Sequence, residues 1–528
     1  MNKRFRDIFF FLICFFLVFY NIPRGLRINF LGGPIARMLV FYPIIIGGIY
    51  TLWYEKKYNN LLFYKKEFLK FIMIYTGITF LSLILGLAYY PFFGEILSGP
   101  IEQIEKLPKL LVFFSNLGFK IQVETLLPLW MIARMIKGYF LELVYTFCAS
   151  YMFFCWYYDD WKKCFKISIL SVISSLCLVI IYSLFIELPY LVGDNASARI
   201  LEIINPYLHP IKEDGKWYPP LLWENQLRSI FSEPSHFGMY TSFAMPFLWY
   251  LVYKDRIILG SILTLLLTFL LFLTKARTGF MLFLGEIVLL LLFIGLFARH
   301  KDCLKKTGLI ILCSLVVFTG SNYFIANYVD KRPQVKKENI AKRVDLKKSM
   351  VSYIDSNATS LANPDKRSNR ARYSIMEADF RIGMDHPILG VGRGLRNGYI
   401  PQYLPEKGKQ NGEVKMWLEY REKLGILKSG FPSLGEYTGR FGETGILGLL
   451  VFLAPVLFLI FSMIKKIKDD TFQYKLEYGM FLISLLGIMA SGIGDSLNIT
   501  YCYWVLLGLG YAMCFGKAGD EKDINERT

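Results

Sequence analysis

The sequence has few charged residues and few of the groups that bind metals. Asp, Glu, Lys and Arg make up only 19% of its 528 residues, and it contains four histidines. The nine cysteines lie in apolar runs or short connecting segments and form neither a CxxC pair nor a Cys/His group. The sequence therefore supports neither a disulfide framework nor a zinc site, and no metal or cofactor is expected.

Hydrophobic residues are abundant and gathered into long runs. They make up 54% of the chain, and a soluble protein with this content would expose large apolar patches. A lipid-embedded surface is the simpler explanation, so the sequence predicts an all-α polytopic membrane protein with about 12 transmembrane helices of about 20 residues each. The expected spans are 8–22, 36–53, 68–90, 138–157, 167–191, 237–253, 257–274, 279–298, 307–325, 443–464, 476–492 and 499–516.

The first apolar run follows Lys3, Arg4 and Arg6, as in a signal peptide. No small-residue cleavage site follows it, so we expect the run to be retained as the first span. If the N-terminus is cytoplasmic, every strongly basic short loop falls on the cytoplasmic side, together with the C-terminus. The expected divisions are spans one to nine in 1–325 with outer loops near 91–137 and 192–236, a large extracytoplasmic loop at 326–442, three spans in 443–516 and a cytoplasmic tail at 517–528.

The formal net charge of +18 would also suit a nucleic-acid-binding protein. Most of the basic residues nevertheless lie in loops between apolar runs, a distribution typical of membrane topology and of acidic lipids or ligands. Long loops are translocated largely regardless of charge, so the basic large loop does not contradict the topology. We therefore expect a plasma-membrane protein that binds no nucleic acid.

The first candidate site lies where the sixth span begins, with a cation, a carboxylate and an imidazole at Arg228, Glu233 and His236. Pro234 suits the first turn of a helix, and Ser232 is a plausible cap. A helix starting here would direct free N–H groups at an anion such as phosphate. Glu233 or His236 could accept a proton from a hydroxyl. Simple helix capping with an interfacial histidine explains the same residues equally well.

The second candidate is the tight turn between the seventh and eighth spans, with Lys275 and Arg277. Both would face outward, against the prevailing charge bias, and an arginine presents a planar fork suited to two phosphate oxygens. Snorkelling toward the membrane surface is the competing explanation.

The third candidate is the segment from His386 to Gly394 in the large loop, which reads HPILGVGRG and includes Arg393. Its glycines would allow close backbone approach to an anion or a sugar. A purely structural glycine turn is the alternative. Glu142, Glu286 and Asp495 lie in spans or at their edges and need partners or a cavity, but no role is assigned to them.

Taken in order, these segments resemble the bacterial O-antigen polymerase (Wzy) and O-antigen ligase superfamily. The resemblance rests on FSEPSHFG at 231–238, KARTG at 275–279, HPILGVG at 386–392 and ETGILG at 443–448. It covers roughly 228 to 450. The first five spans are similar only in general character.

The resemblance implies a metal-independent glycosyltransferase of the membrane-embedded C type. Such enzymes move glycans from a polyprenyl-pyrophosphate carrier on the outer side of the plasma membrane. By this resemblance, Arg277 matches a pyrophosphate-binding arginine, with Arg228 a candidate second one. Ligases have a histidine shortly before the ETGILG-like segment, whereas this chain reads FPSLGEY at 431–437. This departure and the SEPSH form favour a polymerase.

The sequence thus predicts a polymerase of lipid-linked repeat units, with Glu233 or His236 as base. Arg277, Arg228, Lys275, His386 and Arg393 are the expected contacts of the pyrophosphate or glycan. Expected partners are the lipid-linked oligosaccharide and membrane lipids, together with a chain-length regulator and a flippase. The alternatives are a ligase for finished chains and a transporter of the same lipid-linked sugars. The chain shows no paired repeats typical of transporters.

Overall fold

The computed structural model describes residues 3–22, 26–28, 36–58, 65–208, 225–254, 256–297, 301–329, 367–498 and 500–518. The first part of the expected large loop and most of the expected tail lie outside these ranges, as does the middle part, 209–224, of the expected loop at 192–236. Within the described ranges, all the regular elements are helices.

The N-terminal half contains α1 (Lys3–Phe15), η1 (Phe16–Val18), α2 (Phe41–Tyr58), α3 (Lys65–Ala88), α4 (Phe93–Ser98), η4 (Ile101–Ile104), α5 (Leu107–Asn116), α6 (Val123–Leu143), η5 (Val144–Cys148), α7 (Ala149–Tyr157), α8 (Trp161–Tyr182), η6 (Ser183–Glu187), α9 (Leu188–Val192), α10 (Asn195–Leu208) and α11 (Pro234–Tyr253). The C-terminal half contains α12 (Ile257–Leu273), α13 (Arg277–Phe297), α14 (Lys301–Phe324), η7 (Ile325–Val329), α17 (Arg367–Asp385), α18 (Arg396–Tyr403), α19 (Glu406–Lys409), α20 (Gly412–Leu424), α21 (Glu436–Lys468), α22 (Lys475–Ser491) and α23 (Cys502–Phe515).

Each of the expected spans contains a helix, and the all-α membrane class is confirmed. The apolar helices α12 and α23 are shorter than a usual span. The full count of transmembrane helices stays a prediction. Within the part of the chain that the structure describes, the helices long and apolar enough to cross a membrane are Lys66–Ala88, Val123–Tyr157, Trp161–Val192, Arg277–Phe297, Lys301–Val329 and Glu436–Lys468.

The short basic turns gather at one end of the helix bundle. The Arg6 guanidinium donates to the Trp156 carbonyl over 2.7 Å, and the Lys517 amide donates to the Tyr158 carbonyl over 2.6 Å. The start of α1, the α7–α8 turn and the end of α23 therefore lie together, and we call this the basic end. Further contacts there join Lys163 to Asp7, Lys254 to Glu477 and Lys466 to the Cys514 carbonyl. The opposite end, where α11, α13 and α21 begin, is the motif end.

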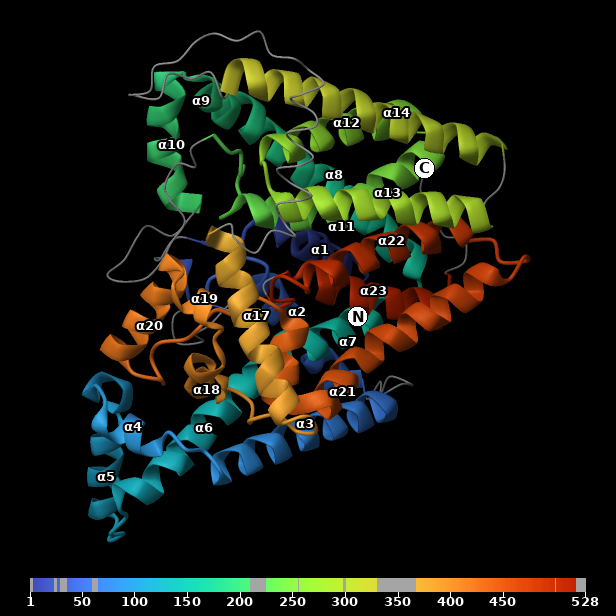
Figure 1. Cartoon of the computed structure of the whole chain (residues 1–528). Coiled ribbons are helices and arrows are strands. Elements are labelled where there is room, and N and C mark those ends of the chain that lie inside the picture. The colour runs from blue at the N-terminus through green and yellow to red at the C-terminus, as the bar shows by residue number, and fades with distance from the viewer. Residues whose placement is uncertain are drawn as a thin grey trace, which may run out of the picture.

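The main core surrounds α11, whose residues are almost all buried. This helix packs against α12, α13 and α22, and Figure 1 shows α12–α14 on one side of it and α21–α23 on the other. A second core joins α4–α6 to α17–α20 through buried side chains such as Leu127, Ile375 and Val414. The second part of the large loop is thus a folded helical unit beside the bundle (Figure 1).

Candidate functional site

The first predicted motif forms the turn into α11 at the motif end. The helix begins at Pro234 as expected, because proline needs no N–H partner in a first turn. The N-cap position is Glu233 rather than Ser232, and its side chain makes no capping hydrogen bond. Instead, the Ser235 hydroxyl donates to the Glu233 carboxylate over 3.2 Å, and Asn21 donates to Ser232 over 2.8 Å. The half-buried Glu233 carboxylate is left beside the helix start.

His236 lies in the first turn of α11 with its ring stacked on Tyr20, 4.4 Å between centroids and 7° between planes. Its Nδ1 atom is buried and has no hydrogen-bond partner among the described residues. Such a buried polar atom is costly unless another group meets it. The stacking fixes the ring while this nitrogen remains available for a proton or a ligand hydroxyl.

A contact between two glycines brings the second motif to the first. A Cβ atom placed on Gly238 would lie 2.6 Å from the Gly279 Cα atom, so α11 and α13 touch through their backbones at the motif end. Gly238 is two residues after His236, and Gly279 is two residues after Arg277. The amide of Leu227 also donates to the Leu273 carbonyl over 3.1 Å. The predicted base and the predicted phosphate-binding arginine therefore start neighbouring helices.

The turn before Arg277 is tight because Lys275 has a φ of +51°, a conformation that few side chains adopt. The Thr274 hydroxyl donates to the Leu271 carbonyl and accepts from the Ala276 amide over 3.0 Å, which fixes the turn locally. Lys275 and Arg277 are both half-buried at this position.

The turn between α22 and α23 adds a carboxylate that the sequence left without a role. Burial raises the pKa of Asp495, while the charges of His236 and Arg372 lower it and that of Glu233 raises it. His236, Arg372 and Glu233 are therefore each close enough to Asp495 for their charges to act on it. Arg372, from α17, also donates to the Gly494 carbonyl over 2.8 Å. The site thus includes a residue of the large loop that sequence reasoning missed.

Arg228 is buried in the same segment, with only 1% of its surface exposed. Its guanidinium donates to the Ser232 carbonyl over 3.2 Å. The backbone amides of Arg228 and Ser229 donate to the Glu187 carboxylate over 2.9 and 2.5 Å. These contacts hold the loop before α11 in shape. The role of Arg228 as a phosphate ligand stays a prediction.

The third motif fills a break in α21. The helix is interrupted at Gly445, where φ is +64° and ψ is −167°. Here the Ile446 amide donates to the Pro387 carbonyl over 2.8 Å, and the Val391 amide donates to the Gly442 carbonyl over 3.0 Å. A Cβ atom on Gly390 or Gly445 would collide with the opposing backbone. The contacts therefore explain these glycines by close backbone packing.

His386 and Arg393 lie on either side of this packed turn and differ in environment. His386 is exposed, with Tyr399 as an aromatic neighbour at 6.0 Å. It lies 14 residues along from Arg372, or about 21 Å at 1.5 Å per helical residue. Arg393 instead points into the protein and pairs with Glu142 of α6. The structure therefore does not bring His386 to the start of α11.

Arg393 belongs to a partly buried ion network that sequence reasoning missed. Arg440 of α21 pairs with Glu142 over 3.1 Å and with Glu436, and it donates to the Tyr75 hydroxyl over 2.8 Å. We call Glu142, Arg393, Glu436 and Arg440 the ion network. Glu436 and Arg440 are four residues apart at the head of an apolar run, which is the one local signal for such a pair.

The ion network reaches the candidate site through the α22–α23 turn. Glu436 accepts from the Ser496 hydroxyl and the Leu497 amide, each over 3.0 Å, and these residues directly follow Asp495. Among the described residues, no group of three or more His, Cys, Asp or Glu side chains could hold a metal ion. The motif end brings together carboxylates, an imidazole and cationic side chains.

Comparison with known families agrees with this picture. Residues 262–420 match the O-antigen ligase family model. The match supports the O-antigen ligase and polymerase superfamily, which confirms the resemblance at that level and does not distinguish the two activities. It includes Lys275, Arg277, His386 and Arg393, whereas Glu233 and His236 lie before it. No curated protein matches the chain.

Proposed function

We propose that this protein is a membrane glycosyltransferase that polymerises polyprenyl-pyrophosphate-linked repeat units into a surface polysaccharide. The superfamily match and the membrane-type helices support the enzyme class. The observation that carries the proposal is the contact between Gly238 and Gly279. In support of the proposal, this contact makes the helix start that contains Glu233 and His236 a neighbour of the helix start that contains Arg277.

In the proposed reaction, an acceptor sugar hydroxyl attacks the anomeric carbon of the donor glycan. The new glycosidic bond forms as the bond from that carbon to the pyrophosphate oxygen breaks. Glu233 or His236 takes the hydroxyl proton. Arg277 and Lys275, helped by the positive helix starts, meet the charge of the leaving pyrophosphate. Stabilising this developing charge is expected to accelerate the reaction more than the proton transfer does.

The proposed setting is a bacterial plasma membrane crossed by about 12 helices of about 20 residues, with the motif end facing outward. The architecture would then be of the C type found among membrane glycosyltransferases. The gathering of lysines at the basic end supports a cytoplasmic location for that end. A flippase would supply the lipid-linked repeat units from the cytoplasmic side, and a chain-length regulator would limit the product.

A ligase that transfers finished chains to an acceptor is the second candidate, favoured by the description of the matching family model. The stretch before α21 argues for the polymerase, because Phe431 to Tyr437 lacks the histidine expected in ligases. In this stretch, the Phe431 and Pro432 carbonyls accept from Arg396 over 3.0 Å each, so it is held by the folded loop.

Lipid-linked intermediates in a deletion strain separate the two activities. Loss of a polymerase leaves single lipid-linked repeat units, whereas loss of a ligase leaves long lipid-linked chains. Complementation with Arg277→Ala, Glu233→Ala and His236→Ala, matched for membrane abundance, then tests the roles. Arg277→Ala is expected to shorten the glycan ladder most, with a loss of about 100- to 1,000-fold in rate. A near-normal ladder from Arg277→Ala would refute the charge assignment.

A further inference from the structure

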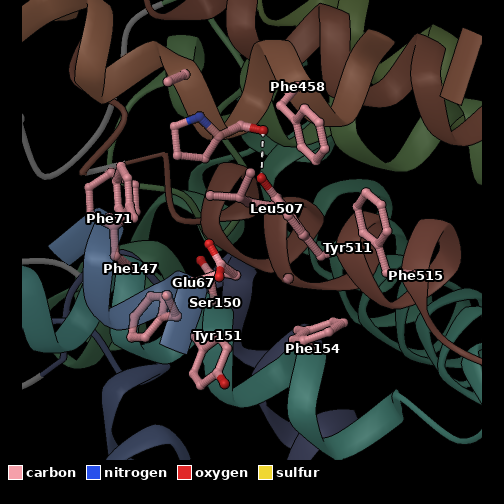
Figure 2. Close-up of a pocket in the computed structure, with 14 residues that line it drawn as sticks. Glu67, Phe71, Phe147, Ser150, Tyr151, Phe154, Phe458, Leu507, Tyr511 and Phe515 are labelled. Atoms are coloured by element: carbon pink, nitrogen blue, oxygen red, sulfur yellow. Dashed lines mark hydrogen bonds between the residues drawn. The ribbon is translucent and has the colours of Figure 1, made fainter. Parts of the chain in front are cut away.

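A second site lies far from the predicted chemistry, in the half of the bundle near the basic end. It is a cavity of about 440 Å³ between α3, α7, α21 and α23. Figure 2 shows aromatic side chains gathered around it, with Phe71 and Phe147 on one side and Phe458, Tyr511 and Phe515 on the other. The cavity lies beside the first turns of α3 and the last residue of α23, so it opens at the level of the membrane nearest the basic end.

The cavity is large but has few hydrogen-bond partners for water. At about 30 Å³ per molecule, its volume would hold about 15 waters, each of which needs two or more polar partners. Two of the hydroxyl groups in its wall are already used in hydrogen bonds to the backbone. The Ser150 hydroxyl donates to the Trp504 carbonyl over 2.7 Å, and the Tyr511 hydroxyl donates to the Pro455 carbonyl over 2.9 Å. The Glu67 carboxylate pairs with Lys70 over 3.1 Å.

The cavity walls belong to helices that face hydrocarbon. The stretches Lys66–Ala88 and Glu436–Lys468, which contain α3 and α21, are long and apolar enough to span a membrane. Their outer surfaces carry exposed apolar side chains, including Leu69, Met73 and Phe461. An apolar space open to the hydrocarbon of a membrane is filled by a lipid chain, because lipid chains are the solvent around these helices.

The rim of the cavity carries three lysines and one carboxylate, that of Glu67, which is 70% exposed and pairs with Lys70, so positive charge prevails. Lys66 precedes the wall residue Glu67 and is exposed, and the Lys70 side chain is 62% exposed. Lys465 is exposed on α21, seven residues after Phe458 and hence on the same face two turns nearer the basic end. Cations beside the mouth of a hydrocarbon pocket favour an anionic headgroup.

We infer that this cavity binds an acyl chain of an anionic glycerophospholipid from the leaflet at the basic end, with the lipid phosphate near Lys66, Lys70 and Lys465. The inference rests on the membrane location and is independent of the glycosyltransferase proposal. The stack of Phe68 on Tyr151, 4.0 Å between centroids and 4° between planes, closes α3 onto α7 beside this chain. The bound lipid would complete the packing of α3 against α21 and α23.

The test uses the full-length protein in nanodiscs and phosphatidylglycerol with a photoreactive acyl chain. Crosslinked peptides are expected at Phe68–Phe71 and Tyr151–Phe154, and unlabelled phosphatidylglycerol should compete at least about fivefold better than phosphatidylcholine. Ala454→Trp, which fills the cavity, should reduce this labelling at least fivefold. Leu457→Trp, one turn along α21 on an exposed position, is the matched control and should leave it unchanged.

The paired change Lys70→Gln and Lys465→Gln is a second variant that leaves the core intact. It should abolish the preference for phosphatidylglycerol, whereas the same change at Lys106 and Lys109 should not. Equal labelling in Ala454→Trp and Leu457→Trp would overturn the inference, as would equal competition by the two phospholipids. Stronger competition by polyprenyl phosphate would also overturn it and assign the cavity to the substrate carrier.

Discussion

The candidate site and the ion network contain similar side chains but differ in whether the polar atoms of those side chains have hydrogen-bond partners. In the ion network, Glu142 and Glu436 each receive hydrogen bonds from a buried arginine, and Arg440 reaches three different partners. In the candidate site, the buried Nδ1 atom of His236 has no hydrogen-bond partner among the described residues. The first cluster is complete within the chain, whereas the second has capacity left for a ligand.

This difference distinguishes a structural role for the ion network from a ligand-binding role for the candidate site. A buried ion pair whose charges meet each other holds helices in place, and its loss is expected to reduce stability. A buried polar atom without a partner is tolerated where a substrate supplies one. Because Glu436 binds the residues that follow Asp495, the ion network fixes the turn that carries this carboxylate to the site.

Removing one member of the ion network should give the largest effect on stability. Arg440→Ala removes the only arginine that the described residues bring to Glu436 and leaves Glu142 with Arg393 alone, and we expect the free energy of unfolding to fall by about 3–5 kcal/mol. The matched control is Arg381→Ala, which removes an exposed pair with Glu377 and should change stability by at most about 1 kcal/mol. Thermal unfolding in detergent measures both. Equal midpoints for the two variants would contradict the bracing role.

The glycine contact should be the next most sensitive feature. In Gly238→Ala the new methyl group meets the Gly279 backbone, so α11 and α13 must separate at the motif end. We expect a loss of about 1–3 kcal/mol in stability and a larger fractional loss of activity. Gly285→Ala is the control, because nothing lies within 4 Å of its added methyl group. Wild-type activity in Gly238→Ala would show that the active geometry does not depend on this close contact between α11 and α13.

The pH dependence of activity tests whether Asp495 acts in the site. Because burial raises its pKa, this carboxylate takes up a proton at a higher pH than an ordinary aspartate. Its negative charge near His236 and Arg372 is therefore lost early as the pH falls, and activity should fall with it. Asp495→Asn should remove that acidic decline and lower the activity at neutral pH severalfold. An unchanged pH profile would exclude Asp495 from the site.

The smallest effect is expected at His386. Its ring is exposed, and it lies at the opposite end of α17 from Arg372. His386→Ala should change stability by no more than about 0.5 kcal/mol and should shorten the glycan ladder less than any change at Glu233, His236 or Arg277. A loss equal to that of Arg277→Ala would show that the substrate extends along α17 to this residue.

Local patterns in the sequence predicted the helices and the turns that begin them. Proline at the first turn placed the start of α11 at Pro234, and the length of the apolar runs placed the long helices. The turn before Arg277 also lies where expected. These features depend on neighbouring residues, so a single sequence is enough to find them.

Contacts between distant segments could not be predicted in this way. Arg393 and Arg440 reach Glu142 across 251 and 298 residues, and the Gly238–Gly279 contact depends on how two helices cross. Arg372 comes to the site from the large loop, and the way α17 of this loop packs against the bundle has no local signal in the sequence. The glycines of the third motif suggested a ligand site equally well, because close packing against α21 requires the same residue type.

Chain extension by the purified protein tests the central claim most directly. The protein in liposomes is given a lipid-linked repeat unit, and the products are sized by mass spectrometry. We expect lipid-linked oligomers that grow by whole repeat units, with extension abolished in the double variant of Glu233→Gln and Arg277→Ala. The absence of any extension by the wild-type protein, or normal extension by this double variant, would contradict the account.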